Sequence, residues 1–256
     1  MASEAKSTIN PKVVSPAEWT AARKKLLAKE KEFTRLRDEL SRERRELPWE
    51  KVEKPYIFEG AKGKESLADL FGGKSQLIVY HFMLGPGWIE GCPSCSFIAD
   101  CFDGTPVHLA HRDITLLAVS RAPLAEIEAY KKRMGWGFNW VSSFGSDFNF
   151  DYQASYPKED MAGGETYYNY EMTSRFTGEE RPGASVFYKN PAGEVFHTYS
   201  TYGRGLDILL GAYNWIDLAP KGRDEANVKP HAMAWVRRHD SYDDAPLVSI
   251  GGPAFR

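Results

Sequence analysis

The residues best suited to chemistry are two cysteines that Pro93 and Ser94 separate. Cys92 and Cys95 follow an apolar segment, and Pro93 suits the first position of a helix that opens at the cysteines. A helix N-terminus presents free N–H groups and a partial positive charge, which favour a thiolate and lower the pKa of a cysteine placed there. Cys92 is therefore the expected nucleophile.

Cys95 is expected to act as the resolving thiol. The two intervening residues bring Cys95, one turn inside the helix, within disulfide distance of Cys92. Cys92 would attack a substrate disulfide, and Cys95 would then attack the mixed disulfide and release the product. The alternative is a pair of buried, inert cysteines, but the strand–dithiol–helix context favours the redox interpretation.

A third cysteine, Cys101, allows a different kind of site. On a helix it points about 120° away from Cys95 and lies roughly 9 Å further along, so we expect it in the core. The alternative is a Cys₃His zinc site made by the three cysteines with His108 or His111, although structural zinc sites usually take two separated pairs of ligands. We therefore predict no metal ligand and no cofactor.

Two further side chains could accept a proton from the dithiol. His81 lies on the strand that ends near the cysteines, and Glu90 precedes Cys92 by two residues. A strand histidine with satisfied hydrogen bonds and an ordinary carboxylate are the interpretations that we favour for them.

The elements around the dithiol predict a parallel pair of strands joined by a right-handed crossover. Apolar runs over 75–83 and 113–120 are the two strands, with the helix over 92–102 between them. The pattern then predicts a helix over 123–134, a short strand over 138–143, an irregular excursion over 147–182, a hairpin of 185–189 with 195–199, and a last helix over 205–215.

A long charged helix is expected before this region. Ser15 and Glu18 can form a capping box around Pro16, and Leu47-Pro48 ends the helix. One apolar stripe repeats every seven residues along it, at Trp19, Leu26, Phe33 and Leu40. The stripe could pair with a second copy of the chain in a homodimer, but we expect it to pack on its own domain because fewer than four heptads are unbroken.

Composition and charge limit the class of protein, its partners and its cellular compartment. The chain has 256 residues, of which 42% are hydrophobic and 27% charged, so it can bury a core. A formal charge of −2 predicts no general attraction to nucleic acid or to an anionic membrane. No apolar run is long enough for an export signal or a membrane span, and three clustered cysteines suit a reducing cytoplasm.

Several motifs resemble those of a bacterial family of uncharacterised thioredoxin-like proteins, usually labelled predicted dithiol-disulfide oxidoreductases. The resemblance runs from about Trp19 to Tyr242. It rests on motifs that include Gly91-Cys-Pro-Ser-Cys-Ser96, Thr198-Tyr-Ser-Thr-Tyr-Gly-Arg-Gly-Leu-Asp207 and Arg237-Arg-His-Asp240. The resemblance implies a thioredoxin-like fold, with thiol–disulfide exchange at Cys92 and Cys95 as the activity.

Two departures separate the chain from better-known thioredoxin-fold enzymes. The segment 185–190 is similar to the strand that follows the cis-proline of thioredoxins, but Gly183 stands at the proline position and Pro182 lies one residue earlier. The loop 84–91 is similar in length to that of peroxiredoxins, but Ile89 stands where they carry a Thr or Ser. A thiol peroxidase is therefore the weaker enzyme alternative.

We accordingly expect an α/β fold, a thioredoxin-like three-layer α/β/α sandwich over residues 50–218, with a helical extension over 1–49 and an extended tail over 219–256. The predicted activity is oxidoreduction of a protein or small-molecule thiol or disulfide by Cys92 and Cys95. The competing hypothesis is a non-enzymatic binding or scaffold protein with structural or zinc-binding cysteines. Four aromatic residues should either line a substrate groove above the C-terminal strand ends or fill the core: Trp88, Trp136, Trp140 and Phe144.

Overall fold

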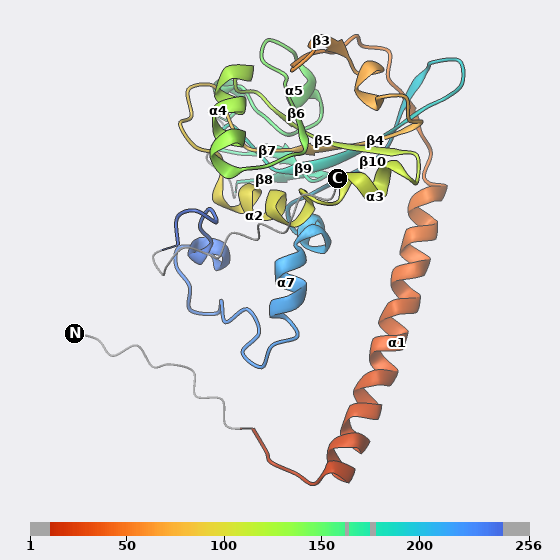
Figure 1. Cartoon of the computed structure of the whole chain (residues 1–256), viewed down its shortest axis with the longest axis vertical. Helices are drawn as coiled ribbons and strands as arrows, with labels where there is room; N and C mark the ends of the chain where they lie inside the picture. The colour runs from red at the N-terminus through yellow and green to blue at the C-terminus, as the bar shows by residue number, and fades with distance from the viewer. Residues whose placement is uncertain (1–10, 162–163, 175–177, 243–256) are drawn as a thin grey trace, which may run out of the picture.

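An eight-stranded mixed sheet with the order β1-β10-β9-β4-β5-β6-β2-β3 forms the centre of the protein (Figure 1). The computed structural model describes residues 11–161, 164–174 and 178–242. The sheet strands are β1 (Glu50–Lys51), β2 (Ile57–Gly60), β3 (Gly63–Ser66), β4 (Gln76–His81), β5 (Ile114–Ser120), β6 (Asn139–Ser142), β9 (Gly183–Lys189) and β10 (Val195–Tyr202). A separate antiparallel pair consists of β7 (Thr166–Tyr168) and β8 (Glu171–Thr173).

Helices cover both faces of this sheet and extend beyond it. The α-helices are α1 (Pro16–Glu46), α2 (Pro93–Phe102), α3 (Pro106–Ala110), α4 (Leu124–Met134), α5 (Phe148–Asp151), α6 (Lys158–Met161) and α7 (Gly211–Ile216). The described residues also form the 3-10 helices η1 (Asp69–Phe71), η2 (Gly203–Leu209) and η3 (Ala232–Trp235). Figure 1 shows α2 and α7 on one side of the sheet and α5 on the other.

The middle of the sheet has the connectivity of a thioredoxin-like fold. β4 is parallel to β5 through α2, antiparallel to β9 on its other side, and β9 forms a hairpin with β10. The predicted strands, the parallel pair and the hairpin are therefore confirmed, and so is the expected mixed α/β thioredoxin-like fold with a long N-terminal helix. The outer strands β1, β2 and β3 are too short to have stood out in the sequence.

Two apolar cores lie on opposite faces of the sheet because successive side chains of a strand alternate. From β4, Tyr80 packs with the face that α2, α4 and α7 cover, whereas Leu77 and Val79 pack on the other face. Phe148 of α5 and Phe71 of η1 close that second face, so its helical layer is made of short pieces.

The C-terminal part of the chain departs from the expected single helix. Residues 203–209 form the 3-10 helix η2, and α7 begins only at Gly211. Beyond α7, the described tail packs back on the domain, with Val236 buried and Trp235 in edge contact with Phe97 of α2. The segment 147–182, which was expected to be irregular, contains the short elements α5, α6, β7 and β8.

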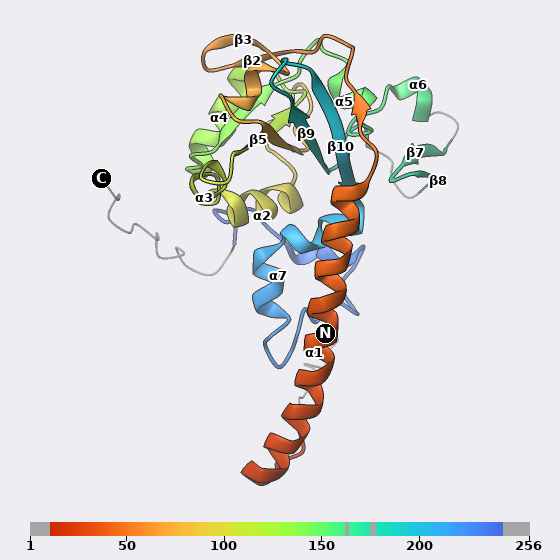
Figure 2. The ribbon, with the colours of Figure 1, turned by 90° about the vertical axis from the view of Figure 1, so that its right-hand side faces the viewer.

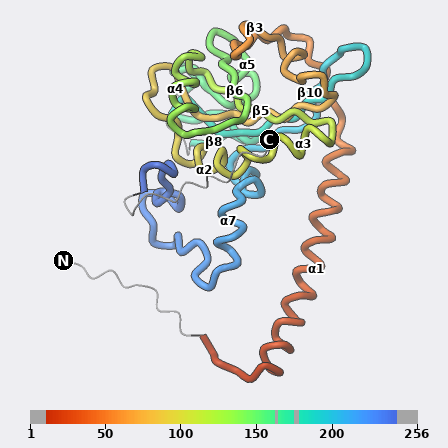
Figure 3. Tube along the Cα trace, viewed as in Figure 1, coloured from red at the N-terminus to blue at the C-terminus, as the bar shows by residue number. Residues whose placement is uncertain are grey.

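The N-terminal helix begins as predicted but packs differently. Ser15 and Glu18 form the expected capping box, and the helix ends before Leu47. The expectation that the apolar stripe packs on its own domain is wrong, because no residue of α1 is buried. The helix leads into β1 at the sheet edge, where Arg44 also lies over the Tyr199 ring of β10, and Figures 2 and 3 show it extending away from the domain from that point. Among the described residues, no helix combines the length and the apolar run that crossing a bilayer requires.

His81 generates a prediction about acid stability. This fully buried imidazole bonds Ser185 Oγ at 2.9 Å and stacks on Phe148, and burial lowers its pKa to about 3. Between about pH 6.5 and 3 the unfolded chain therefore binds a proton that the folded chain does not, so stability falls as the pH falls. We expect this histidine to contribute about 1.4 kcal/mol per pH unit to the free energy of unfolding, measured in urea from pH 7 to 4.5.

Replacing the histidine isolates that contribution. His81→Asn should flatten the pH dependence by about one proton, whereas His231→Asn, at an exposed position, should leave it unchanged. An equal slope in all three proteins would contradict a neutral buried His81.

Candidate functional site

The two cysteines lie where the C-terminal end of β4 meets the N-terminus of α2. Cys92 is the N-cap residue and is half-buried, and Cys95 is fully buried one turn inside the helix. The Met83 backbone contacts both residues: its carbonyl accepts a hydrogen bond from Cys92 N at 3.1 Å, and its N–H donates to Cys95 Sγ at 3.5 Å. The strand end therefore positions the dithiol, and no disulfide joins the two cysteines in this structure.

The surroundings of the two sulfurs separate their acidities. The pKa of Cys92 is lowered, first by the Cys95 thiol, then by the N–H groups of Cys95 and Ser94 and by the Arg238 guanidinium, while burial acts in the opposite direction. The pKa of Cys95 is raised well above its usual value, first by burial and then by the Cys92 thiol. Negative charge on the pair therefore resides on Cys92, the sulfur nearer to solvent.

The loop before Cys92 is tightly held. A Cβ atom at Gly91 would lie 2.6 Å from the Phe82 ring and 2.7 Å from the Tyr130 ring, so this position has no room for a side chain. The Gly91 carbonyl accepts hydrogen bonds from Arg238 Nε and Nη2 at 3.1 and 2.8 Å. The C-terminal motif at 237–240 thus reaches the dithiol, a role that its position far along the chain did not reveal.

A buried tyrosine beside Cys95 also escaped the sequence analysis. Tyr80 is 2% exposed, and its hydroxyl has no well-formed hydrogen bond among the described residues. Burial, followed by the nearby Cys95 thiol, raises the pKa of Tyr80 well above its usual value. In the sequence, a tyrosine within an apolar strand looks like an ordinary core residue. Its position relative to the dithiol depends on the alternation of side chains between the two faces of β4, which places Tyr80 on the face of the dithiol.

The two suggested proton acceptors lie elsewhere. His81, next to Tyr80 in sequence, points to the opposite face of the sheet, where it stacks on Phe148 and Tyr152. Glu90 forms ion pairs with Arg133 at 2.5 Å and Arg238 at 2.9 Å, and the Arg133 hydrogen bond lowers the pKa of its carboxyl. Neither residue therefore lies where it could accept a proton from the dithiol, although His81 is not the fully hydrogen-bonded histidine that was expected, because its buried Nδ1 has no hydrogen-bond partner among the described residues.

Cys101 belongs to a packing contact. It is half-buried, and its thiol donates to Phe97 O at 3.2 Å and accepts from Ala212 N of α7 at 3.5 Å. Within residues 11–161, 164–174 and 178–242, no three histidine, cysteine or acidic side chains gather in an arrangement that could hold a metal ion. The zinc alternative therefore finds no ligand set in the described part of the chain.

The segment opposite the dithiol differs from the thioredoxin pattern, as its sequence suggested. Gly183 begins β9, and the Tyr202 ring approaches so closely that a Cβ there would lie 2.6 Å from it. The cis peptide bond among the described residues is that between Lys229 and Pro230, so Pro182 follows a trans bond. The Pro182 carbonyl accepts a hydrogen bond from Tyr168 Oη at 2.7 Å.

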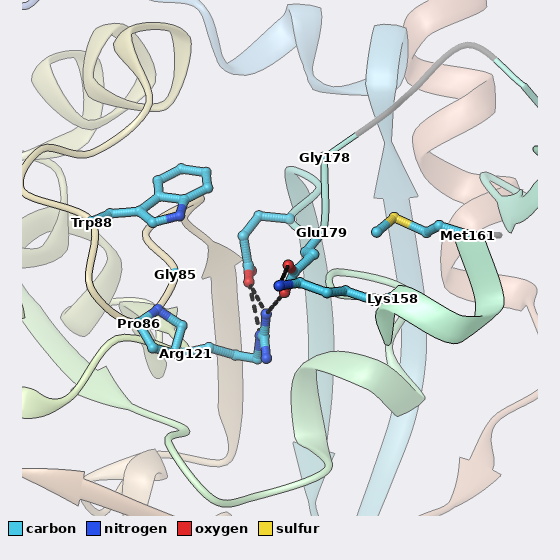
Figure 4. Close-up of a pocket in the computed structure, with 9 residues that line it drawn as sticks. Gly85, Pro86, Trp88, Arg121, Lys158, Met161, Gly178 and Glu179 are labelled. Atoms are coloured by element: carbon cyan, nitrogen blue, oxygen red, sulfur yellow. Dashed lines mark hydrogen bonds and ion pairs between the residues drawn. The ribbon is translucent and has the colours of Figure 1, made fainter.

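The four aromatic residues do not line one common groove, and two of them take the core alternative. Trp136 and Trp140 are buried in the core, and Phe144 lines a surface depression with Tyr56 and Phe58 instead. Trp88 alone of the four lines the cavity of about 460 Å³ that Figure 4 shows. Its wall also includes an ion pair between Arg121 and the buried Glu180, with Arg121 Nε donating at 2.8 Å, but neither cysteine.

Solved structures with similar folds share little sequence with this chain. They include a PrxQ mutant from Xylella fastidiosa, at 12% identity and a TM-score of 0.39, covering 64% of this chain and 90% of that one. Peroxidoxin BcpB from Mycobacterium tuberculosis has 11% identity and a TM-score of 0.39, covering 66% and 97%. A putative protein disulfide isomerase from Bacteroides thetaiotaomicron has 15% identity and a TM-score of 0.37, covering 66% and 91%. Likeness at this level carries no argument about chemistry.

Comparison at the level of sequence is more decisive. No curated protein matches the chain. A family model described as "Bacterial protein of unknown function (DUF899)" matches residues 8–242, which include the dithiol, the whole sheet and the arginine motif that reaches Gly91. The chain therefore belongs to the bacterial DUF899 family.

Proposed function

We propose that this protein is a dithiol-disulfide oxidoreductase in which Cys92 is the nucleophile and Cys95 the resolving thiol. The observation that carries the proposal is the unequal environment of the two sulfurs. Cys92 is half-buried and its pKa is lowered, whereas Cys95 is fully buried and its pKa is raised. A reactive thiol must be a thiolate and must be reachable, and the lowered pKa and partial exposure of Cys92 support this role.

The proposed exchange has two steps. The Cys92 thiolate attacks one sulfur of a substrate disulfide, forming a Cys92–substrate disulfide and expelling the other substrate sulfur as a thiolate. Cys95 then gives up its proton, which the first expelled substrate thiolate takes through solvent, and its thiolate attacks Cys92 Sγ; this forms the Cys92–Cys95 disulfide, breaks the Cys92–substrate disulfide and releases the second thiolate. The substrate gains two electrons and the protein loses two, so a thiol reductant must return the protein to the dithiol state. We place the reaction in the cytoplasm, where such reductants are present.

The second step needs a group that favours the buried Cys95 thiolate. Within the described residues the Met83 N–H already donates to Cys95 Sγ, and the Tyr80 hydroxyl lies close to the same sulfur without a well-formed hydrogen bond. We assign Tyr80 as a positioning residue whose hydroxyl stabilises the Cys95 thiolate. A charge-assisted hydrogen bond of this kind is stronger than one between neutral groups.

The first prediction of this proposal concerns Cys92 acidity. The rate of alkylation at Cys92, followed by mass spectrometry across pH, should rise through a midpoint well below about 8.5, the ordinary thiol pKa. The same rate should greatly exceed that at Cys95 or Cys101. Equal, slow labelling of all three cysteines would leave a structural role for the pair.

Two arginine variants refine this measurement. Arg238→Met removes a cation that lowers the pKa of Cys92, so the alkylation midpoint should move to higher pH. Arg237→Met removes the same charge one residue away, where the side chain donates to Ala234 O and Val236 O, and should leave the midpoint unchanged.

The second prediction concerns the mixed disulfide. Cys95→Ser should accumulate a covalent adduct between Cys92 and a small aromatic disulfide probe, because the resolving sulfur is absent. Cys92→Ser should accumulate none, and both results are read as intact mass without reductant. An adduct on Cys95 in the Cys92→Ser protein would reverse the assigned roles.

The third prediction concerns Tyr80. In Tyr80→Phe, decay of the mixed disulfide should slow several-fold, on the order of the tenfold change that 1.4 kcal/mol produces. The alkylation rate of Cys92 should change little. Tyr213→Phe is the matched control, because that buried hydroxyl bonds Glu225 rather than a thiol. A Tyr80→Phe protein that resolves the adduct at the normal rate would remove this residue from the mechanism.

A further inference from the structure

The long helix α1 leaves an apolar stripe without a partner. Its 31 residues would span about 46 Å, and none of them is buried. Single exposed apolar residues need no explanation, but a continuous row of large ones marks an interaction surface. The large apolar side chains of the row are each between 49% and 66% exposed: Trp19, Leu26, Phe33, Leu36 and Leu40.

The spacing of this row is that of a coiled coil. With Trp19 assigned to heptad position a, the following a positions are Leu26, Phe33 and Leu40. Ala22 and Leu36 occupy d positions, and the polar residues Lys29 and Glu43 occupy the other two. Two polar d positions weaken such a seam but do not remove it, because the a positions are apolar throughout.

The charges beside the seam select the partner and its direction. In a parallel, in-register pair, each g residue faces the e residue five positions later on the other helix. All four such pairs have opposite charges when two copies of this chain are aligned: Glu18 with Arg23, Lys25 with Glu30, Glu32 with Arg37, and Glu39 with Arg44. A helix that meets a second copy of itself therefore finds complementary charge along its whole length.

An antiparallel pair has only half of this complementarity. There g faces g and e faces e, so full overlap places like charges together at Glu18 with Glu39 and at Arg23 with Arg44. The other two pairs, Lys25 with Glu32 and Glu30 with Arg37, have opposite charges, whereas in the parallel arrangement all four pairs do.

The two polar d positions weaken the parallel arrangement, because in register Lys29 faces Lys29 and Glu43 faces Glu43 of the other copy. The adjacent e residues of the other helix, Glu30 and Arg44, carry the opposite charges and offset this repulsion.

We propose that α1 pairs with the α1 of a second copy of this chain as a parallel, in-register, two-stranded coiled coil. The contacts that α1 makes within its own chain do not cover the apolar row. Within one chain Arg23 pairs with Glu30 at 2.8 Å, and Arg44 lies 4.7 Å from the centre of the Tyr199 ring near the sheet edge. Exposed ion pairs of this kind are weak and can exchange for partners on a second helix. The proposal is independent of the chemistry at the dithiol.

The first experiment measures the mass of the full chain by sedimentation at increasing concentration. We expect a monomer–dimer equilibrium, and Phe33→Glu should make the protein monomeric by placing two carboxylates in the seam. Because no residue of α1 is buried and Phe33 is 66% exposed, the variant should keep the thermal unfolding transition of the domain. A chain that stays monomeric at every concentration, or a dimer that survives Phe33→Glu, would overturn the proposal.

A charge exchange tests the pairing itself. Glu32→Arg alone should weaken the dimer by about tenfold, because it creates two like-charged pairs with Arg37. Adding Arg37→Glu should restore the affinity, since opposite charges face each other again. Asp38→Arg makes the same charge change on the outer face of the helix and should have little effect. Equal effects of Glu32→Arg and Asp38→Arg, or no restoration in the double variant, would refute the assigned pairing.

A cysteine variant tests whether the two α1 helices run parallel and in register. In a parallel, in-register pair residue 40 meets its own copy, so Leu40→Cys should form a covalent dimer under mild oxidation. The unsubstituted chain, which keeps its native cysteines, gives the background. A stable dimer without this disulfide would show an antiparallel or shifted arrangement and would contradict the proposal.

Discussion

The junction between β4 and α2 is the constraint on which the rest of the site depends. Met83 uses its carbonyl for Cys92 and its N–H for Cys95, so one backbone unit sets the position of both sulfurs. That unit follows β4, which is paired on both sides, with β5 and with β9. The absence of a side chain at Gly91 lets the loop approach Phe82 and Tyr130 closely enough to make the turn.

Alternation along β4 divides two buried polar environments that adjoin in sequence. Tyr80 faces the dithiol in an otherwise apolar core. His81 faces the opposite side, where Ser185 Oγ, Ser200 Oγ and His197 Nε2 continue a chain of hydrogen bonds of 2.9, 2.8 and 2.7 Å. The sheet itself separates the two groups, so a proton-accepting histidine is kept away from Cys95 while a tyrosine is brought to it.

Segments far apart in sequence complete the site from the solvent side. Arg238 contacts both the carbonyl of Gly91 and the carboxylate of Glu90, and Arg133 of α4 joins Glu90 to Asp240. The cation that helps to stabilise a Cys92 thiolate is thus held in place by a carboxylate network. The C-terminal residues that contribute it are part of the dithiol environment rather than a passive tail.

Local patterns in the sequence determined the helix that begins at Pro93, the parallel strands on either side of it, the hairpin and the capping box at Ser15. These depend on contacts between near neighbours, which composition and spacing record. The neighbours of the dithiol were decided by tertiary structure alone, because the orientation of Tyr80 depends on strand register and the contact of Arg238 joins segments almost 150 residues apart. The exposure of the apolar row on α1 was also decided by tertiary structure alone. Spacing predicts an apolar face, but whether the helix folds back on its domain depends on its attachment at the sheet edge.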